Sequence, residues 1–73
     1  MARIEVKSEV AGRVWKIEAE AGATLATDDP ILIIESMKME IPVGAPKACK
    51  LVEVRVKEEE PVAEGQVVAV VEA

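Results

Sequence analysis

The sequence of this chain repeats itself, and the repeat limits the folds that are open to it. At an offset of 37 residues, apolar positions match apolar positions almost from end to end. The matching pairs include Ala11 with Ala48, Val14 with Leu51, Ile17 with Val54, Leu25 with Val62, Ile31 with Val68, and Ile34 with Val71. Self-similarity of this kind indicates one supersecondary unit used twice. Two copies in 73 residues predict a closed domain with internal two-fold pseudo-symmetry.

The local patterning predicts strands in both copies. Arg3–Lys7 and Met39–Val43 alternate apolar and polar residues, as half-buried strands do. Ile31–Ile34 and Val67–Val71 are short apolar runs, rich in β-branched residues, that suit buried strands. Few stretches show helical periodicity. We therefore expect an all-β fold.

Two further segments alternate imperfectly, and they do so in the same way. In Gly12–Ala19 and in Lys50–Val56 the apolar phase slips once, at equivalent places in the two copies. A slip shared by both halves predicts a common β-bulge or bend rather than noise.

Size and charge narrow the class of protein. A chain of this length forms one small domain and buries roughly 60% of the surface that the unfolded chain exposes. The net charge is −5 with scattered acids, which argues against a nucleic acid or an anionic membrane as partner. No apolar stretch is long enough to span a bilayer, and the N-terminus lacks the apolar core of a secretory signal. We expect a monomeric, cytoplasmic protein.

The residue types that are missing exclude most catalytic chemistry. The chain has no histidine, and Cys49 is its only cysteine. This rules out an internal disulfide, most zinc, haem and iron–sulfur sites, and Ser-His-Asp or Cys-His nucleophilic catalysis. We expect a protein that is not an enzyme and that holds no metal ion.

The midpoint of the repeat carries an unusual turn, Met37-Lys38-Met39, between two apolar strands. Turns normally carry Gly, Asn, Asp or Ser, and large apolar side chains are normally buried. An exposed turn lysine is usually only a solubilising charge, but its two methionine neighbours favour covalent attachment of a carried group to Lys38. Met39 is in phase with Ile41 and could serve partly as a strand-end hydrophobe, whereas Met37 is expected to contact a partner enzyme.

The repeat also places this turn in space. The position equivalent to Met37 falls just beyond Ala73, and the position equivalent to Lys38 is Met1, so both lie where the chain ends. The termini should therefore be neighbours at one end of the domain, with Lys38 projecting from the other end.

The segment Glu35–Val43, followed by Ala45-Pro46, resembles the biotinyl domain of biotin carboxyl carrier proteins. The similarity extends from Gly12 to Val71 and is greatest to small stand-alone biotin/lipoyl attachment proteins. It implies a flattened β-barrel, or barrel-sandwich hybrid, of two four-stranded antiparallel sheets. It also implies that residues 1–73 are a single biotinyl/lipoyl-type carrier domain whose attachment lysine is Lys38.

The resemblance implies a function as well. A biotin protein ligase would attach biotin to Lys38, with Met37 and Met39 as flanking recognition residues. A biotin carboxylase would then carboxylate the biotin, and a carboxyltransferase would pass the carboxyl group to an acyl-CoA, as in acetyl-CoA carboxylase, or to a keto acid. The cofactor carries the chemistry and the protein carries the cofactor.

Two other interpretations remain open from the sequence. Related lipoyl domains carry lipoate for 2-oxo-acid dehydrogenase complexes, but they usually have Asp-Lys-Ala around the lysine, so the two methionines favour biotin. An unmodified structural module, such as the lipoyl-like domain of a membrane-fusion adaptor, usually flanks a helical hairpin that this chain lacks.

The chain departs from the family at several turns. Asp28 and Glu59 stand where the family usually has glycine, and Ala48-Cys49 stands where it usually has Asp-Gly. If those glycines served a left-handed backbone, the turns here should differ or carry strain. The extra "thumb" insertion of some carriers is also absent.

Overall fold

The computed structural model describes residues 2–73, and these residues form eight strands and no helix, so none of them lies in a helix that could cross a membrane. The strands are β1 (Arg3–Lys7), β2 (Gly12–Ile17), β3 (Thr24–Leu25), β4 (Pro30–Ser36), β5 (Met39–Gly44), β6 (Cys49–Val54), β7 (Pro61–Val62) and β8 (Val67–Glu72). The predicted all-β class is confirmed.

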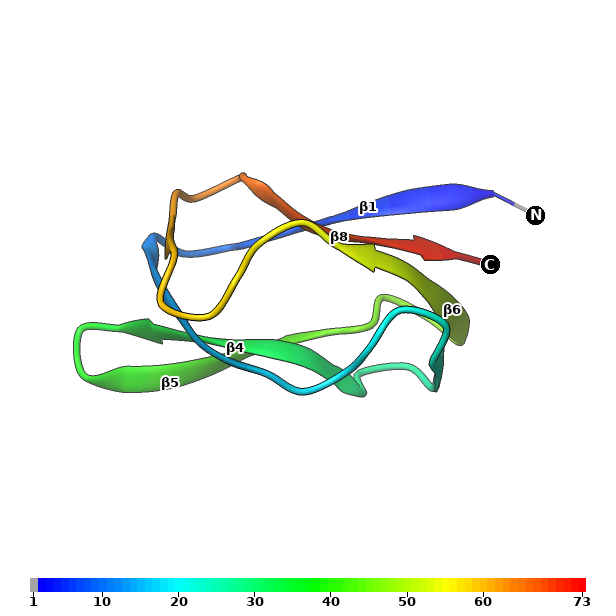
Figure 1. Ribbon diagram of the computed structural model, residues 1–73, viewed down its shortest axis with the longest axis horizontal. Helices are drawn as coiled ribbons and strands as arrows, with labels where there is room; N and C mark the ends of the chain where they lie inside the picture. The colour runs from blue at the N-terminus through cyan, green and yellow to red at the C-terminus, as the bar shows by residue number, and fades with distance from the viewer. Residues whose placement is uncertain (1) are drawn as a thin grey trace.

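The strands form two antiparallel sheets that lie face to face (Figure 1). One has the order β1-β8-β6-β3 and the other the order β5-β4-β2-β7. This confirms the expected pair of four-stranded antiparallel sheets. Within residues 2–73 no strand ladder joins one sheet to the other, so the domain is a flattened sandwich rather than a closed barrel.

The pseudo-symmetry expected from the repeat relates one sheet to the other. The offset of 37 residues converts β1, β8, β6 and β3 into β5, β4, β2 and β7, in the observed strand order. The irregularities follow the same rule: the β2–β4 register shifts between Val14 and Lys16, and the β6–β8 register between Leu51 and Glu53. The shared bulge predicted from the slipped patterning is confirmed.

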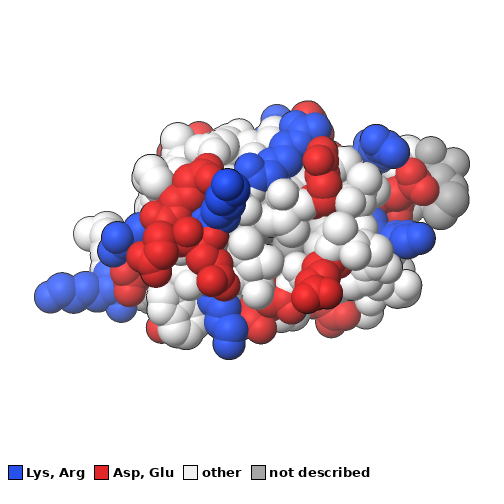
Figure 2. All heavy atoms as spheres, viewed as in Figure 1, with Lys and Arg blue, Asp and Glu red and all other residues white. Residues whose placement is uncertain are grey.

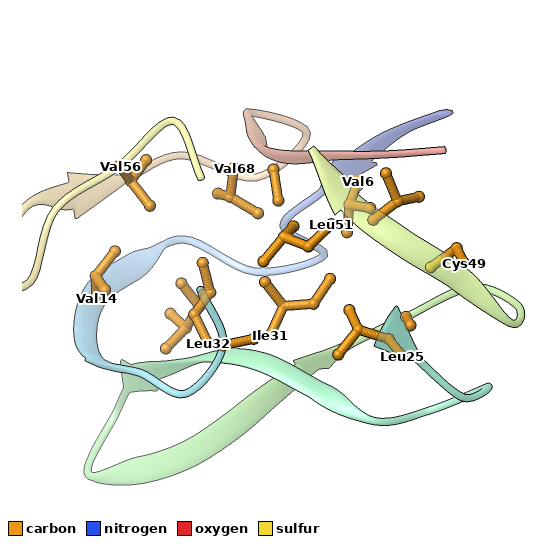
Figure 3. Packing of buried hydrophobic residues seen from close by; sticks show 14 of the residues in the cluster. Val6, Val14, Leu25, Ile31, Leu32, Cys49, Leu51, Val56 and Val68 are labelled. Carbon is orange, nitrogen blue, oxygen red and sulfur yellow. The ribbon is translucent and has the colours of Figure 1, made fainter. Parts of the chain in front are cut away.

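The core lies between the two sheets (Figure 3). Its fully buried larger members are Val14, Ile31, Leu32, Ile34, Leu51, Val68 and Val71. Burial of one such side chain contributes about 1.5–3 kcal/mol, so a few residues of β4 and β8 supply much of the stability. Cys49 is buried in this core as a small filler, whereas Trp15, at the bulge of β2, is 43% exposed.

The two ends of the domain have equivalent backbones. Ala2 and Ala73 exchange two backbone hydrogen bonds of 2.8 and 2.9 Å, which brings the termini together. We call the residue 37 positions away in the other copy of the repeat the mate of a residue. The mates of Ala2 and Ala73 are Met39 and Ser36, which face each other at the end of the β4–β5 hairpin. Figure 1 shows the termini at the right and this hairpin at the left, as the repeat predicted.

At the two turns where Asp28 and Glu59 replace the usual glycine, the backbone keeps its left-handed conformation and is strained. Asp28 and Glu59 adopt left-handed backbones with φ of 69° and 73°. Their mates in the repeat are Gly65 and Gly22, with φ of 84° and 96°. Each turn therefore keeps the same conformation in both copies, but in one copy a residue with a Cβ occupies it. Aspartate tolerates this region better than glutamate, so the larger cost falls on Glu59.

Glu59→Gly is expected to raise the free energy of unfolding by about 1 kcal/mol, because glycine adopts this backbone without a Cβ clash. Among residues 2–73, the carboxylate that is lost pairs with Arg13 alone, at the surface, and such a pair is worth little. Urea denaturation of the two proteins measures the difference.

Gly22→Ala is the matched control, because a Cβ at Gly22 would meet no atom within 4 Å. It isolates the backbone effect and should lower the free energy of unfolding by about 1 kcal/mol. A Glu59→Gly protein less stable than the original would show that this turn is unstrained.

Candidate attachment site

The candidate site stands on the β4–β5 hairpin, whose root is fixed in the sheet. Ile34, which is fully buried, pairs with Ile41, and β4 also pairs with β2 on its other side. A side chain at Gly12 of β2 would collide with the carbonyl oxygen of Glu35, so the two strands approach closely there. The last pair of the hairpin is Ser36 with Met39, which leaves Met37 and Lys38 as a two-residue turn.

This turn has an unfavourable backbone for the residues it carries. Met37 and Lys38 both have positive φ, 52° and 66°. Two-residue hairpin turns with positive φ at both positions normally use Asn-Gly or Gly-Gly, which tolerate it. Holding other residues there costs of order 1–3 kcal/mol each, and such strain is concentrated at functional sites. The chain keeps long side chains where the fold alone would favour short ones.

The two methionines lie in solvent. Met37 is 93% exposed and Met39 is 65% exposed. Met39 is the first residue of β5 and is in phase with the half-buried Ile41, as expected of a strand-end hydrophobe, but its exposure means that it adds little to the core. Apolar, flexible side chains grouped at one tip suit contact with another protein.

Lys38 lies between them and is exposed. Among residues 2–73, no hydrogen bond or ion pair involves its side chain. Figure 2 shows basic atoms extending from the hairpin end of the molecule, at the left. A lysine amine in this position can be reached by a large partner.

Acidic residues surround the base of the hairpin, and Figure 2 shows them as a red band beside it. Glu35 and Glu40 lie opposite each other on β4 and β5. The Arg13 guanidinium lies 4.0 Å from the Glu35 carboxylate and 3.8 Å from that of Glu59. All of these side chains are exposed, so each ion pair is worth under about 1 kcal/mol.

The site also holds a contact that the sequence analysis did not anticipate. The Ser36 hydroxyl donates a hydrogen bond of 2.8 Å to the carbonyl oxygen of Ala11, in the loop between β1 and β2. A comparison of the two copies of the repeat could have pointed to Ser36, since alanine stands at the equivalent position, Ala73.

The hairpin tip is a presentation site rather than a cleft. The groove between β1 and β5 is lined by residues such as Ile4, Val6 and Val43, and does not include Met37, Lys38 or Met39. Within residues 2–73, no three His, Cys, Asp or Glu side chains gather as metal ligands. At the hairpin tip the Lys38 amine is a nucleophile with no partner group beside it among the described residues, which suits acylation by another protein.

The fold is a rigid two-sheet scaffold, and among its six exposed lysines Lys38 is the one that stands on the two-residue turn of the β4–β5 hairpin. Residues 4–71 match the biotin/lipoyl family model, which is described as "Biotin-requiring enzyme". The chain belongs to this family, whose attachment domains carry the cofactor rather than catalyse the reaction.

Similar proteins support this assignment. The chain is 40% identical over 62 residues to the biotin/lipoyl attachment protein of Bacillus subtilis, a match that covers 85% of each chain. It is 39% identical over 67 residues to urea amidolyase of Saccharomyces cerevisiae, covering 92% of this chain and 4% of the yeast protein. The crystal structure of Kluyveromyces lactis urea carboxylase contains a similar fold, with a TM-score of 0.92 and 37% identity, over 97% of this chain and 6% of that one.

Met37→Asn is expected to raise the free energy of unfolding by about 0.5–1 kcal/mol, because asparagine accepts positive φ at lower cost. Thermal or urea unfolding of the variant against the original protein measures it. Met39→Asn is the control: the same change on β5 lies outside the positive-φ turn and should give no gain. Equal effects of both substitutions would refute strain at the turn.

Proposed function

We propose that Lys38 is the residue to which a biotin protein ligase attaches biotin. The observation that carries this proposal is the position of the Lys38 amine at the tip of a strained two-residue turn, where it is exposed and has no partner among residues 2–73. The fit to biotin rests on that amine and on the family to which the chain belongs. Met37 and Met39, which flank the amine in solvent, would contact the ligase or the carboxylase.

In the attachment step the Lys38 amine attacks the acyl carbon of an activated biotin, the biotinyl adenylate. A C–N amide bond forms, the bond from the acyl carbon to the phosphate oxygen breaks, and AMP leaves with one proton released. A lysine amine in water is mostly protonated at neutral pH, and only the neutral form attacks. No base of residues 2–73 hydrogen-bonds the amine, so the ligase must remove the proton. The contribution of this chain to the step is to hold the Lys38 amine where the ligase can reach it.

When attached, biotin supplies a ureido nitrogen that takes up and releases a carboxyl group. The proposed partners are a biotin carboxylase, which uses ATP and bicarbonate, and a carboxyltransferase that acts on an acyl-CoA or a keto acid. This domain holds the attachment point at the end opposite its termini, with a stiff base beneath it. Tethering raises the effective concentration of the carried group at both active sites.

We further propose that residues 1–73 act as one carrier domain, monomeric by itself and cytoplasmic. The hydrophobic core shared by the described residues and the free, buried Cys49 support this view. Met1 lies outside the described residues.

Lys38→Arg is expected to abolish labelling by a biotin protein ligase with ATP and biotin, while the free energy of unfolding stays unchanged because the side chain is in solvent. A streptavidin gel shift and the intact mass measure labelling. Lys57→Arg, a second exposed lysine, is the control and should label normally. Labelling of Lys38→Arg would show that the attachment residue lies elsewhere.

A separate measurement identifies whether the group carried on Lys38 is biotin or lipoate. Protein purified from its own cells should show the intact mass of the biotinylated form, and loss of that mass in Lys38→Arg. A mass shift that matches lipoate would instead establish the lipoyl alternative. Carboxyl transfer to acyl-CoA, keto acid and urea acceptors would then identify the substrate; urea is included because two similar proteins are named for it.

A further inference from the structure

We propose that Ser36 and Ser8 are positioning residues, which fix the root of the Lys38 hairpin for the modifying ligase. The proposal rests on the function assigned to Lys38. The Ser36 hydroxyl, on the last residue of β4, donates to the Ala11 carbonyl oxygen at 2.8 Å. This bond ties the residue next to the turn to the β1–β2 loop.

Ser8 makes that loop a firm anchor. It is 1% exposed, and its hydroxyl donates to the Val10 carbonyl oxygen at 2.6 Å and accepts from the Val10 amide at 3.3 Å. Its backbone amide donates to the Gln66 carbonyl at 2.9 Å, and its carbonyl accepts from the Gly65 amide at 2.8 Å. The loop that receives Ser36 is thereby held to the turn before β8, in the other sheet.

The repeat supplies an internal control for these contacts. The mates of Ser8, Ala11 and Ser36 are Ala45, Ala48 and Ala73. The backbone bonds of Ser8 are reproduced at Ala45, whose amide donates to Asp29 and whose carbonyl accepts from Asp28. The fold therefore forms this loop without a hydroxyl. Both serines of the chain lie at the end that carries Lys38, and the opposite end has none.

The physical reason for such a brace lies in the turn itself. Met37 and Lys38 have positive φ and exposed side chains, so few contacts of their own restrict them. A partner that binds a mobile tip must order it, and that ordering reduces affinity. The root is fixed by the sheet, in which β4 pairs with both β2 and β5, and by the Ser36 hydrogen bond at the end of β4. This lowers the ordering cost before the ligase arrives.

Ser36→Ala is expected to lower kcat/KM for enzymatic biotinylation about two- to fivefold, mainly through KM, as the loss of one exposed hydrogen bond allows. Ser36→Thr keeps the hydroxyl and should restore the rate. Amide hydrogen exchange should rise at Lys38 and Met39 but not in β8. Arg3→Ala, which removes the Arg3–Glu72 ion pair of 3.6 Å at the opposite end, should change none of these values.

Acylation of Lys38 by a small activated ester separates positioning from simple access to the amine. This reaction needs no docking, so its rate should be the same in Ser36→Ala and in the original protein. Ser8→Ala should slow enzymatic labelling in the same direction, and the double variant should be no slower than the slower single one, because both serines act through one loop.

The two proposals fail in different ways. Enzymatic labelling of Ser36→Ala at the original rate, with Lys38→Arg unlabelled, would overturn the positioning role and leave the attachment role intact. Labelling of Lys38→Arg would overturn the attachment role itself. Exchange that rises throughout Ser36→Ala would show that the hydroxyl serves general stability rather than the hairpin.

Discussion

The burial of β4 and β8 between the two sheets is the constraint on which the rest of the molecule depends. These two strands, which are equivalent in the repeat, supply Ile31, Leu32, Ile34, Val68 and Val71, which are five of the seven fully buried large apolar side chains of the core. Because β4 is held on its buried face and paired on both edges, its register is fixed. The packing of β4 in the core therefore sets the direction of the turn that follows it, and Lys38 stands on a rigid strand pair.

Backbone strain has two origins in this chain. At Asp28 and Glu59 it follows from the repeat, because a turn built for glycine in one copy carries another residue in the other. The turn of Met37 and Lys38 has no counterpart in the other copy among residues 2–73, since the equivalent positions fall at the two chain ends. Glycine, which adopts a left-handed backbone without a Cβ clash, would relieve the strain at the first pair. Strain at the second pair is the consequence of placing an amine and a thioether on a two-residue turn.

The pseudo-symmetry separates what the fold requires from what one end adds. Features common to both copies, such as the bulges after Val14 and Leu51 and the loop bonds of Ser8 and Ala45, serve the fold. Features found in one copy mark specialisation, and they gather around the β4–β5 hairpin. Comparison of the two copies of the repeat within one domain therefore distinguishes the end that carries Lys38 from the opposite end.

The sequence by itself determined the all-β class, the pseudo-symmetry, the shared bulge and the placement of Lys38 opposite the termini, because these follow from the repeat and the alternation. The two four-stranded sheets and the family followed from the resemblance of Glu35–Val43 and Ala45-Pro46 to biotinyl domains. Only the tertiary structure decided that Met39 lies in solvent, that Asp28 and Glu59 keep left-handed turns, and that Ser36 reaches Ala11. The reason is that periodicity reports which face of a strand is buried. It does not report φ, or contacts between residues far apart in the chain.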